Sequence, residues 1–245
     1  MVRKKSERLL QLKGHHGFVV AIDGPSGAGK STVSRQLAEA LGGKLLDTGA
    51  MYRSVAYFAL KEEALKEADF ARIARGLRFS TDPKTECLLT NGEDLGHKIR
   101  SEKVSDMASA VSVIREVREI LTKKQRRLAK EWSRRIPVVV EGRDIGTVVF
   151  PKVPFKFYVT ADASVRAERR YEQLKARGVK VSFKKILRQH ESRDERDSTR
   201  KIAPLKCPED AVVVDTSSMG VAQVVKFMRD HIKAHVTLPN IKKSS

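Results

Sequence analysis

The chain has 245 residues, 40% of them hydrophobic and 32% charged, which suits one α/β domain with an insertion or two small domains. No apolar stretch approaches the ~20 residues of a membrane span, and the patch of Leu9, Leu10 and Leu12 is too short for a signal peptide. Cys87 and Cys207 lie far apart, which argues against a disulfide scaffold and against a cysteine-based zinc site. The sequence therefore predicts a cytoplasmic protein with reduced thiols.

The formal net charge of +19 has two interpretations. The first is a polyanionic partner such as RNA. The second is an enzyme that holds several phosphate groups and carries lysine-rich ends, such as residues 3–5 (RKK) and 242–243 (KK). Because the sequence lacks a basic stripe interleaved with base-stacking aromatic residues, the second interpretation is favoured, and nucleic-acid binding through the tails stays open.

Strand patterns alternate with helical patterns along most of the chain. The expected strands are 18–23, 44–46, 137–140, 155–159 and 211–214. The expected helices are about 30–42, 50–61, 67–76, 102–110, 114–133, 164–177, 182–191 and 220–235. Strands that alternate with helices of this length predict a mostly parallel sheet covered by helices on both faces.

The alternation of parallel-type strands and helices is interrupted between about residues 62 and 108. Residues 77–79 and 87–90 have the pattern of short antiparallel strands, and Asn91-Gly92 is a strong hairpin signal. We expect this region to be an insertion in the main fold or a second lobe.

Residues 24–31 (GPSGAGKS) fit the phosphate-binding loop pattern G-x-x-x-x-G-K-[ST] at every fixed position. An apolar strand leads into the loop and a helix leads out, so backbone N–H groups and the helix dipole converge on one concave nest. We expect Lys30 to reach the β- and γ-phosphates and the Ser31 hydroxyl to contact Mg²⁺. The motif thus predicts a nucleoside triphosphate site, the alternative being a glycine-rich turn that binds nothing. The residues predicted to bind this ligand are Gly24, Pro25, Ser26, Gly27, Ala28, Gly29, Lys30, Ser31 and Thr32.

Two other segments are predicted to end at the same edge of the sheet. Thr48 follows the second strand and can cap the next helix, which puts Arg53 about one turn inside it. Arg143 and Asp144 follow the strand at 137–140, beside the phosphate loop if the strands are ordered as in other nucleotide-binding sheets. Each residue alone could be a solvated turn charge, but their joint placement favours an acceptor site.

The densest charge cluster lies between residues 188 and 200. Its members are Arg188, Glu191, Arg193, Asp194, Glu195, Arg196, Asp197 and Arg200. Mixed signs at three- and four-residue spacing indicate an exposed helix with salt bridges. However, Ser198-Thr199 and Ala203-Pro204 break the helical pattern, so we expect the cluster to run into a loop. Arginines on a mobile loop can close over phosphates and exclude water.

These blocks resemble those of the bacterial cytidylate kinases, a family of nucleoside monophosphate kinases, over about residues 17–235. The resemblance is carried by 22–31 (IDGPSGAGKS), 46–53 (LDTGAMYR), 142–151 (GRDIGTVVFP), 193–200 (RDERDSTR) and 203–205 (APL). The phosphate loop is common to many enzymes, whereas the block at 142–151 and the arginine–aspartate run are far more specific. The sequence departs from the family at Thr48, where serine is common, and at Glu141, where aspartate is common, which weakens a role for Glu141 near Mg²⁺.

The resemblance implies a domain organisation and a set of site residues. The implied parts are a core at 17–61 and 109–235, an inserted monophosphate-binding lobe with a β-hairpin at about 62–108, and a lid at about 190–204. A basic extension at 1–16 and a basic tail at 236–245, which we expect to be disordered, fall outside the resemblance. The CMP-binding residues implied are Thr48, Tyr52, Arg53, Ser109, Arg118, Arg143, Asp144, Arg193, Asp197 and Arg200. Asp144 and Arg193 are expected to contact the base, and Asp197 the ribose. The catalytic residues implied are Lys30, Arg143, Arg196 and Arg200, with Ser31 as the metal ligand.

The activity implied is Mg²⁺-assisted transfer of the γ-phosphoryl group of ATP to CMP or dCMP by a monomer. A monophosphate oxygen is already anionic near neutral pH, so positioning and electrostatic stabilisation suffice without a general base. A carboxylate can also accept a hydrogen bond from the exocyclic amine of cytosine, whereas it repels uracil O4.

Two alternatives stay open. The first is a kinase for another acceptor, either UMP or a hydroxyl-bearing metabolite with Asp144 as its base. The second is a regulatory nucleotide switch or an RNA-binding NTPase, although the sequence has no N-K-x-D guanine-reading motif. A purely structural protein is disfavoured because it has no need of a phosphate loop.

Overall fold

The computed structural model describes residues 17–82, 87–176 and 178–236. The predicted basic extension at 1–16 and the predicted tail beyond residue 236 lie outside the described residues. Within the described ranges, no helix is both long enough and apolar enough to cross a bilayer.

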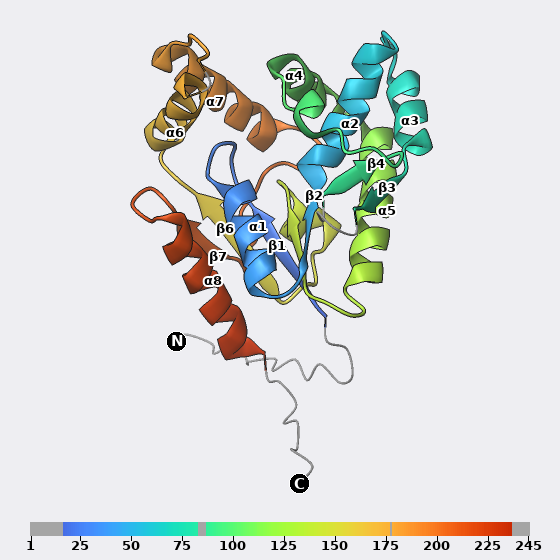
Figure 1. Cartoon of the computed structure of the whole chain (residues 1–245). Coiled ribbons are helices and arrows are strands. Elements are labelled where there is room, and N and C mark those ends of the chain that lie inside the picture. Colours follow the sequence, from blue (N-terminus) through green and yellow to red (C-terminus); the bar gives the residue numbers. More distant parts are fainter. Residues whose placement is uncertain (1–16, 83–86, 177, 237–245) are drawn as a thin grey trace.

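The core is a sheet of five parallel strands in the order β2-β5-β1-β6-β7 (Figure 1). The strands are β1 (Val19–Asp23), β2 (Lys44–Asp47), β5 (Val138–Glu141), β6 (Phe155–Thr160) and β7 (Val212–Asp215). The apolar side chains of the inner strands β5, β1 and β6 are largely buried on both faces, as in sheets covered on both sides, whereas Val213 on the edge strand β7 is exposed. The predicted parallel sheet is therefore confirmed, and β5 lies directly beside β1 as the acceptor-site prediction requires.

Helices cover both faces of this sheet. Successive residues of β1 alternate between the two faces, so Val20 and Ile22 pack with α1 (Lys30–Ala40) and α8 (Val221–His235) in one apolar cluster. Ala21 points the other way, into a second cluster formed with α2 and α5. The helices α2 (Thr48–Lys61) and α5 (Arg115–Trp132) cover that face. The buried residues of α5 include Val117, Leu121 and Leu128, the apolar stripe expected from the sequence.

A group of short elements packs on α2 and α5. They are α3 (Glu67–Gly76), β3 (Phe79–Thr81), β4 (Leu88–Thr90), η1 (Gly96–Ile99) and α4 (Glu102–Val111). Strands β3 and β4 are antiparallel as expected, but β3 begins two residues later than predicted. The Asn91-Gly92 turn follows β4 and closes a bridge between Thr90 and Glu93, so it does not join β3 to β4. The division of the chain into core and inserted lobe stays a prediction.

The charge cluster at 188–200 is helical up to Thr199. Helices α6 (Ala163–Lys175) and α7 (Phe183–Thr199) pack together at the upper left of Figure 1, across from α4. The predicted loop is wrong for residues 190–199, because α7 continues to Thr199. The hydroxyls of Ser198 and Thr199 donate to the Glu195 carbonyl oxygen at 3.1 and 2.7 Å, so they satisfy the last turn rather than break it. Only residues 200–204 of the predicted lid are non-helical.

Candidate active site

The phosphate loop connects β1 to α1 at the carboxyl end of the sheet. Gly24 has a φ of 144°, and a Cβ on it would lie 1.9 Å from the Val159 carbonyl oxygen, so only glycine fits beside β6. Gly29 adopts a left-handed φ of 84° directly before Lys30, the first residue of α1. The strand–loop–helix arrangement predicted from the motif is therefore present, and the N-terminus of α1 lies at the base of the loop.

Lys30 is buried and points back into its own loop. Its Nζ donates to the Pro25 carbonyl oxygen at 2.6 Å. Burial, reinforced by the charge of Arg143, lowers the pKa of Lys30 to about 7. A phosphate anion beside this amine would favour its charged form, so the site is electrostatically suited to a polyphosphate.

A carboxylate from the neighbouring strand meets the first turn of α1. The exposed Ser31 Oγ donates to Glu141 Oε1 at 2.8 Å, while Glu141 Oε2 is buried and accepts no hydrogen bond from the residues that the structure describes. Burial raises the pKa of Glu141, and the charge of Asp47 adds to this effect. A serine hydroxyl and an unsatisfied carboxylate oxygen thus lie together at the mouth of the phosphate loop.

Thr48 does not cap α2, contrary to the prediction. The N-cap is Asp47, whose Oδ1 accepts from the Ala50 N–H at 2.8 Å and whose Oδ2 pairs with Arg53 at 3.0 Å. The Thr48 hydroxyl donates instead to the Glu141 carbonyl oxygen at 2.7 Å. This long-range bond fixes the start of α2 against the end of β5, close to the phosphate loop.

Asp144 lies between two arginines. Its Oδ2 pairs with Arg118, and its Oδ1 lies 3.7 Å from Arg200 Nη2. The ring of Tyr52 packs 5.7 Å from the Arg118 guanidinium carbon, and burial raises the pKa of Tyr52 to about 12. Side chains from α2, α5, the segment after β5 and the end of α7 therefore meet at one buried carboxylate.

A second group of charges from α7 faces the same region. Asp197 accepts from Arg143 Nε at 3.0 Å. Burial lowers the pKa of Arg193 to about 10, helped by the charges of Arg143 and Arg53. Arg196 donates to Ser109 Oγ at 3.0 Å, which links α7 to α4.

Three of these arginines carry buried N–H groups without acceptors among the described residues. They are Arg53 Nε, Arg193 Nε and Arg200 Nη2. Buried donors are normally satisfied, because an unmade hydrogen bond costs free energy. Unsatisfied guanidinium donors on α2 and α7 indicate that this end of the sheet is suited to an oxygen-rich anionic ligand.

Sequence reasoning missed Asp23, the last residue of β1. Its two carboxylate oxygens accept from the N–H groups of Ile145 and Gly146 at 2.8 and 2.7 Å. Burial raises the pKa of Asp23 to about 6. These bonds hold the start of a π-helical turn, η2 (Ile145–Val149), directly after Asp144. The signal in the sequence was an acidic residue at the end of an otherwise apolar strand.

Sequence reasoning also assigned no role to Arg166 and Asp194, which contact the phosphate loop from α6 and α7.

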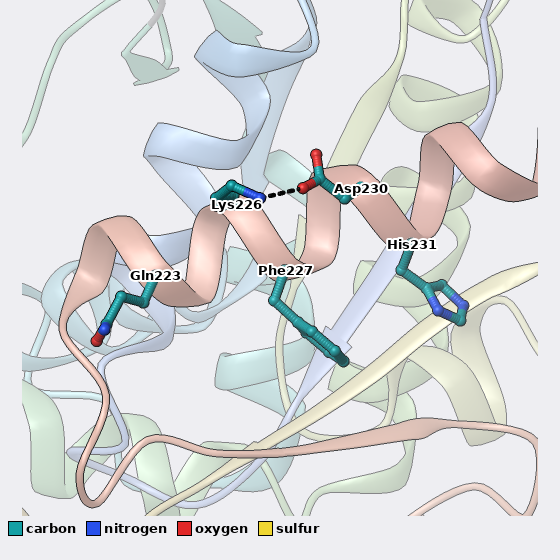
Figure 2. Close-up of a pocket in the computed structure, with 5 residues that line it drawn as sticks. All are labelled: Gln223, Lys226, Phe227, Asp230 and His231. Carbon is teal, nitrogen blue, oxygen red and sulfur yellow. Dashed lines mark hydrogen bonds and ion pairs between the residues drawn. The ribbon is translucent and has the colours of Figure 1, made fainter.

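A hollow lies on the outer face of α8, away from these residues (Figure 2). It is lined by Gln223, Lys226, Phe227, Asp230 and His231. None of the predicted site residues lines this hollow. The candidate site is instead at the carboxyl end of the sheet, where those residues meet.

Comparison with known proteins agrees with this geometry. The family model "Cytidylate kinase" matches residues 20–234. The cytidylate kinase of Caldanaerobacter subterraneus subsp. tengcongensis is 44% identical over 216 residues, which cover 87% of this chain and 94% of that protein. The cytidylate kinase of Rhodococcus jostii is 47% identical over 212 residues, covering 85% of this chain and 91% of that protein. The cytidylate kinase of Corynebacterium glutamicum is 45% identical over 229 residues, covering 91% and 98%. Since the match extends from β1 to α8 and includes every segment of the candidate site, the chain belongs to the cytidylate kinase family.

Proposed function

We propose that the protein transfers the γ-phosphoryl group of ATP to CMP or dCMP, giving ADP and CDP or dCDP. The observation that carries the proposal is the buried Asp144, held by Arg118 and Arg200 at the end of the strand adjacent to the phosphate loop. A donor site and an acceptor site that share one edge of a parallel sheet suit direct transfer between two bound nucleotides.

The donor triphosphate binds at residues 24–32. The backbone N–H groups of the loop and the N-terminus of α1 hold its phosphates, and Lys30 leaves the Pro25 carbonyl oxygen to reach the β- and γ-phosphates. Gly29 supports this role, because its left-handed φ of 84° suits glycine and nothing in the loop occupies the place of a Cβ.

The residues present fit a bound Mg²⁺. The Ser31 hydroxyl and the Glu141 carboxylate, with its unsatisfied Oε2, are the oxygen ligands that Mg²⁺ prefers. The part of the chain that the structure describes holds no cluster of three or more His, Cys, Asp or Glu side chains suited to a metal, which agrees with an ion held largely by the nucleotide. When bound, Mg²⁺ would neutralise negative charge on the phosphates of the nucleotide.

Asp144 reads the base of the acceptor. Its Oδ2 is taken by Arg118, but its Oδ1 lies 3.7 Å from Arg200, too far for a hydrogen bond. Oδ1 can accept from the exocyclic amine of cytosine, whereas uracil would present another acceptor. Arg193 contacts the base, Asp197 contacts the ribose, and Thr48, Tyr52 and Ser109 complete the pocket.

The arginines hold the acceptor phosphate and the group in transfer. Arg53, Arg118, Arg143 and Arg200 supply charge around the phosphates, and Arg196 turns from Ser109 toward them when the lid closes. The acceptor oxygen is already anionic, so no residue has to remove a proton. Catalysis then consists of alignment and charge stabilisation in a site from which water is excluded.

The predicted organisation completes the proposal. The core comprises 17–61 and 109–235, the monophosphate-binding lobe comprises about 62–108, and the lid comprises about 190–204, which includes the end of α7. The family resemblance further supports a cytoplasmic monomer.

A coupled assay of ADP release tests the proposal. The protein, ATP and Mg²⁺ are combined with CMP, dCMP, UMP, AMP or GMP, and Lys30→Met serves as the inactive control. Turnover with CMP and dCMP that exceeds the others at least tenfold is expected, since the carboxylate of Asp144 discriminates between cytosine and uracil. Comparable turnover with UMP would contradict the role of Asp144, and no turnover with any monophosphate would redirect the search to hydroxyl acceptors.

A further inference from the structure

The backbone of one phosphate-loop residue, Ser26, is held by the two helices that follow β6. The Ser26 N–H donates to Asp194 Oδ1 on α7 at 3.3 Å. The Ser26 carbonyl oxygen accepts from Arg166 Nη1 on α6 at 3.0 Å. Both backbone polar groups of Ser26 are therefore bound by side chains far away in sequence.

The two side chains also bind each other. Arg166 Nη1 lies 2.5 Å from Asp194 Oδ2, and Arg166 Nε donates to the Ala161 carbonyl oxygen at 2.9 Å. The Arg166 side chain is only 8% exposed, so water screens the pair weakly. Charge-assisted hydrogen bonds in such surroundings are stronger and more directional than neutral ones. We call the Ser26 backbone with Arg166 and Asp194 the loop clamp.

The helices lie directly over the loop at this point. A Cβ placed on Gly27 would be 2.8 Å from His190 Cε1 and 3.2 Å from Arg166 Cβ. The loop therefore has no room to move toward α6 or α7 at Gly27, and its polar contacts at Ser26 are reinforced by packing.

The helix that clamps the loop is also the helix that carries the acceptor-site charges. Asp194 binds Ser26, the charges of its neighbour Arg193 and of Arg143 interact, and Asp197 binds Arg143. A helical turn is rigid on this scale. The position of the acceptor-binding side chains is consequently fixed relative to the phosphate loop through Asp194.

We propose that Arg166 and Asp194 are positioning residues for phosphoryl transfer, which hold the backbone of Ser26 and thereby set the distance between the phosphate loop and the acceptor side chains of α7. The inference rests on the proposed function. Neither side chain needs to touch a reacting atom, since alignment of the two phosphates is what the clamp supplies.

Substitutions at Asp194 test the clamp, with Glu195→Ala as the matched control. Glu195 is exposed, is adjacent on the same helix and undergoes the same change of charge. Asp194→Ala removes both bonds of the carboxylate, whereas Asp194→Asn keeps an acceptor for the Ser26 N–H and weakens only the pairing with Arg166. We expect kcat to fall about tenfold or more in Asp194→Ala and by less in Asp194→Asn, while Glu195→Ala stays within about twofold of the wild type.

Binding and coupling measurements separate positioning from simple structural support. Calorimetry with a non-hydrolysable ATP analogue should show weaker binding in Asp194→Ala, with CMP binding in the absence of analogue changed less than about threefold. In a double-mutant cycle, Arg166→Lys with Asp194→Asn should be no worse than the worse single variant, because both side chains hold the backbone of the same residue.

Three results would overturn the inference. The first is a lower Tm in Asp194→Ala together with unchanged kcat and analogue affinity, since that describes a structural ion pair only. The second is additive effects of Arg166→Lys and Asp194→Asn. The third is an equal loss in Glu195→Ala. Failure of the proposed function would give a different result, because the wild-type protein itself would not phosphorylate CMP. The affinity of Asp194→Ala for the ATP analogue would then still test the clamp.

Discussion

Asp144 and Arg118 form an ion pair in which the two side chains are only 7% and 5% exposed. A buried pair of this kind contributes little net stability, because removing both charges from water costs about as much as their attraction returns. Removing one partner is different, because it leaves the other charge buried and unpaired. The pair is thus better explained by a binding role than by stability, and this explanation makes Asp144 the most informative residue to change.

Asp144→Asn should shift the choice of acceptor. The amide can donate to uracil O4, which the carboxylate repels, so the ratio of kcat/KM for CMP to that for UMP should fall at least about tenfold. The KM for CMP should rise much more than the KM for ATP. Asp210→Asn, which alters an ion pair between the exposed Asp210 and the buried Lys156, is the control and should leave the ratio unchanged.

Loss of the folded state must be separated from loss of recognition in that variant. Circular dichroism and thermal unfolding report whether Asp144→Asn remains folded with Arg118 unpaired. An equal increase in the KM values for CMP and ATP in a folded variant would rule out Asp144 as the residue that reads the base.

The parallel sheet was predictable because each strand is an apolar run followed by a helical pattern, and this local signal agrees with the tertiary structure. The end of α7 was not predictable, because serine and threonine hydroxyls can either terminate a helix or bond back to its last turn. Neighbouring capping residues raise the same difficulty. Asp47 and Thr48 can both cap α2, and only the bond from Thr48 to Glu141 on β5 decides between them.

The members of the site could be predicted better than their pairings. The motif gave the phosphate loop, and the resemblance gave the arginines and aspartates, but the partner of Asp144 among several arginines depends on how α5 packs against β5. Asp23 was missed because its hydrogen bonds reach backbone groups 122 and 123 residues away. Contacts at such separation leave no periodic trace in a sequence.

Lys30→Met should abolish most of the activity while the protein stays folded. Removing one preorganised cationic donor from a phosphoryl-transfer site should lower kcat by about 10²–10³, as for other donors to a developing anion. Methionine fills the volume of the buried stem, so the fold is maintained. Single-turnover measurements with saturating ATP and CMP check this. A folded variant that turns over at a near-normal rate would show that the loop is wrongly assigned.

The pH dependence of stability gives an independent view of the same lysine. Burial lowers the pKa of Lys30 to about 7 from its ordinary 10.5. Below pH ~7 the amine is charged in both states, and the folded protein carries the full cost of burying it. Between the two values the unfolded chain binds more protons, so the free energy of unfolding rises with pH.

Lys30→Met lacks this titration. The stability of the variant relative to the wild type should therefore be greatest at about pH 6.5 and should shrink by about pH 9.5. Urea unfolding of both proteins at the two pH values measures the change, and the pH-independent loss of the bond to Pro25 cancels in the comparison. A difference in stability that stays constant or grows with pH would mean that Lys30 titrates near its ordinary value.

Glu141→Gln tests the metal site. The substitution keeps a hydrogen-bond acceptor for the Ser31 hydroxyl but removes the negative charge beside it. We expect the concentration of Mg²⁺ needed for half-maximal rate to rise about tenfold, because a supporting carboxylate is lost, while Glu141→Asp retains more of the wild-type response. Because the lost charge is buried, thermal stability without nucleotide should be unchanged or higher. The dependence of the rate on free Mg²⁺ at fixed ATP measures this change. Identical Mg²⁺ curves for Glu141→Gln and the wild type would exclude Glu141 from the metal site.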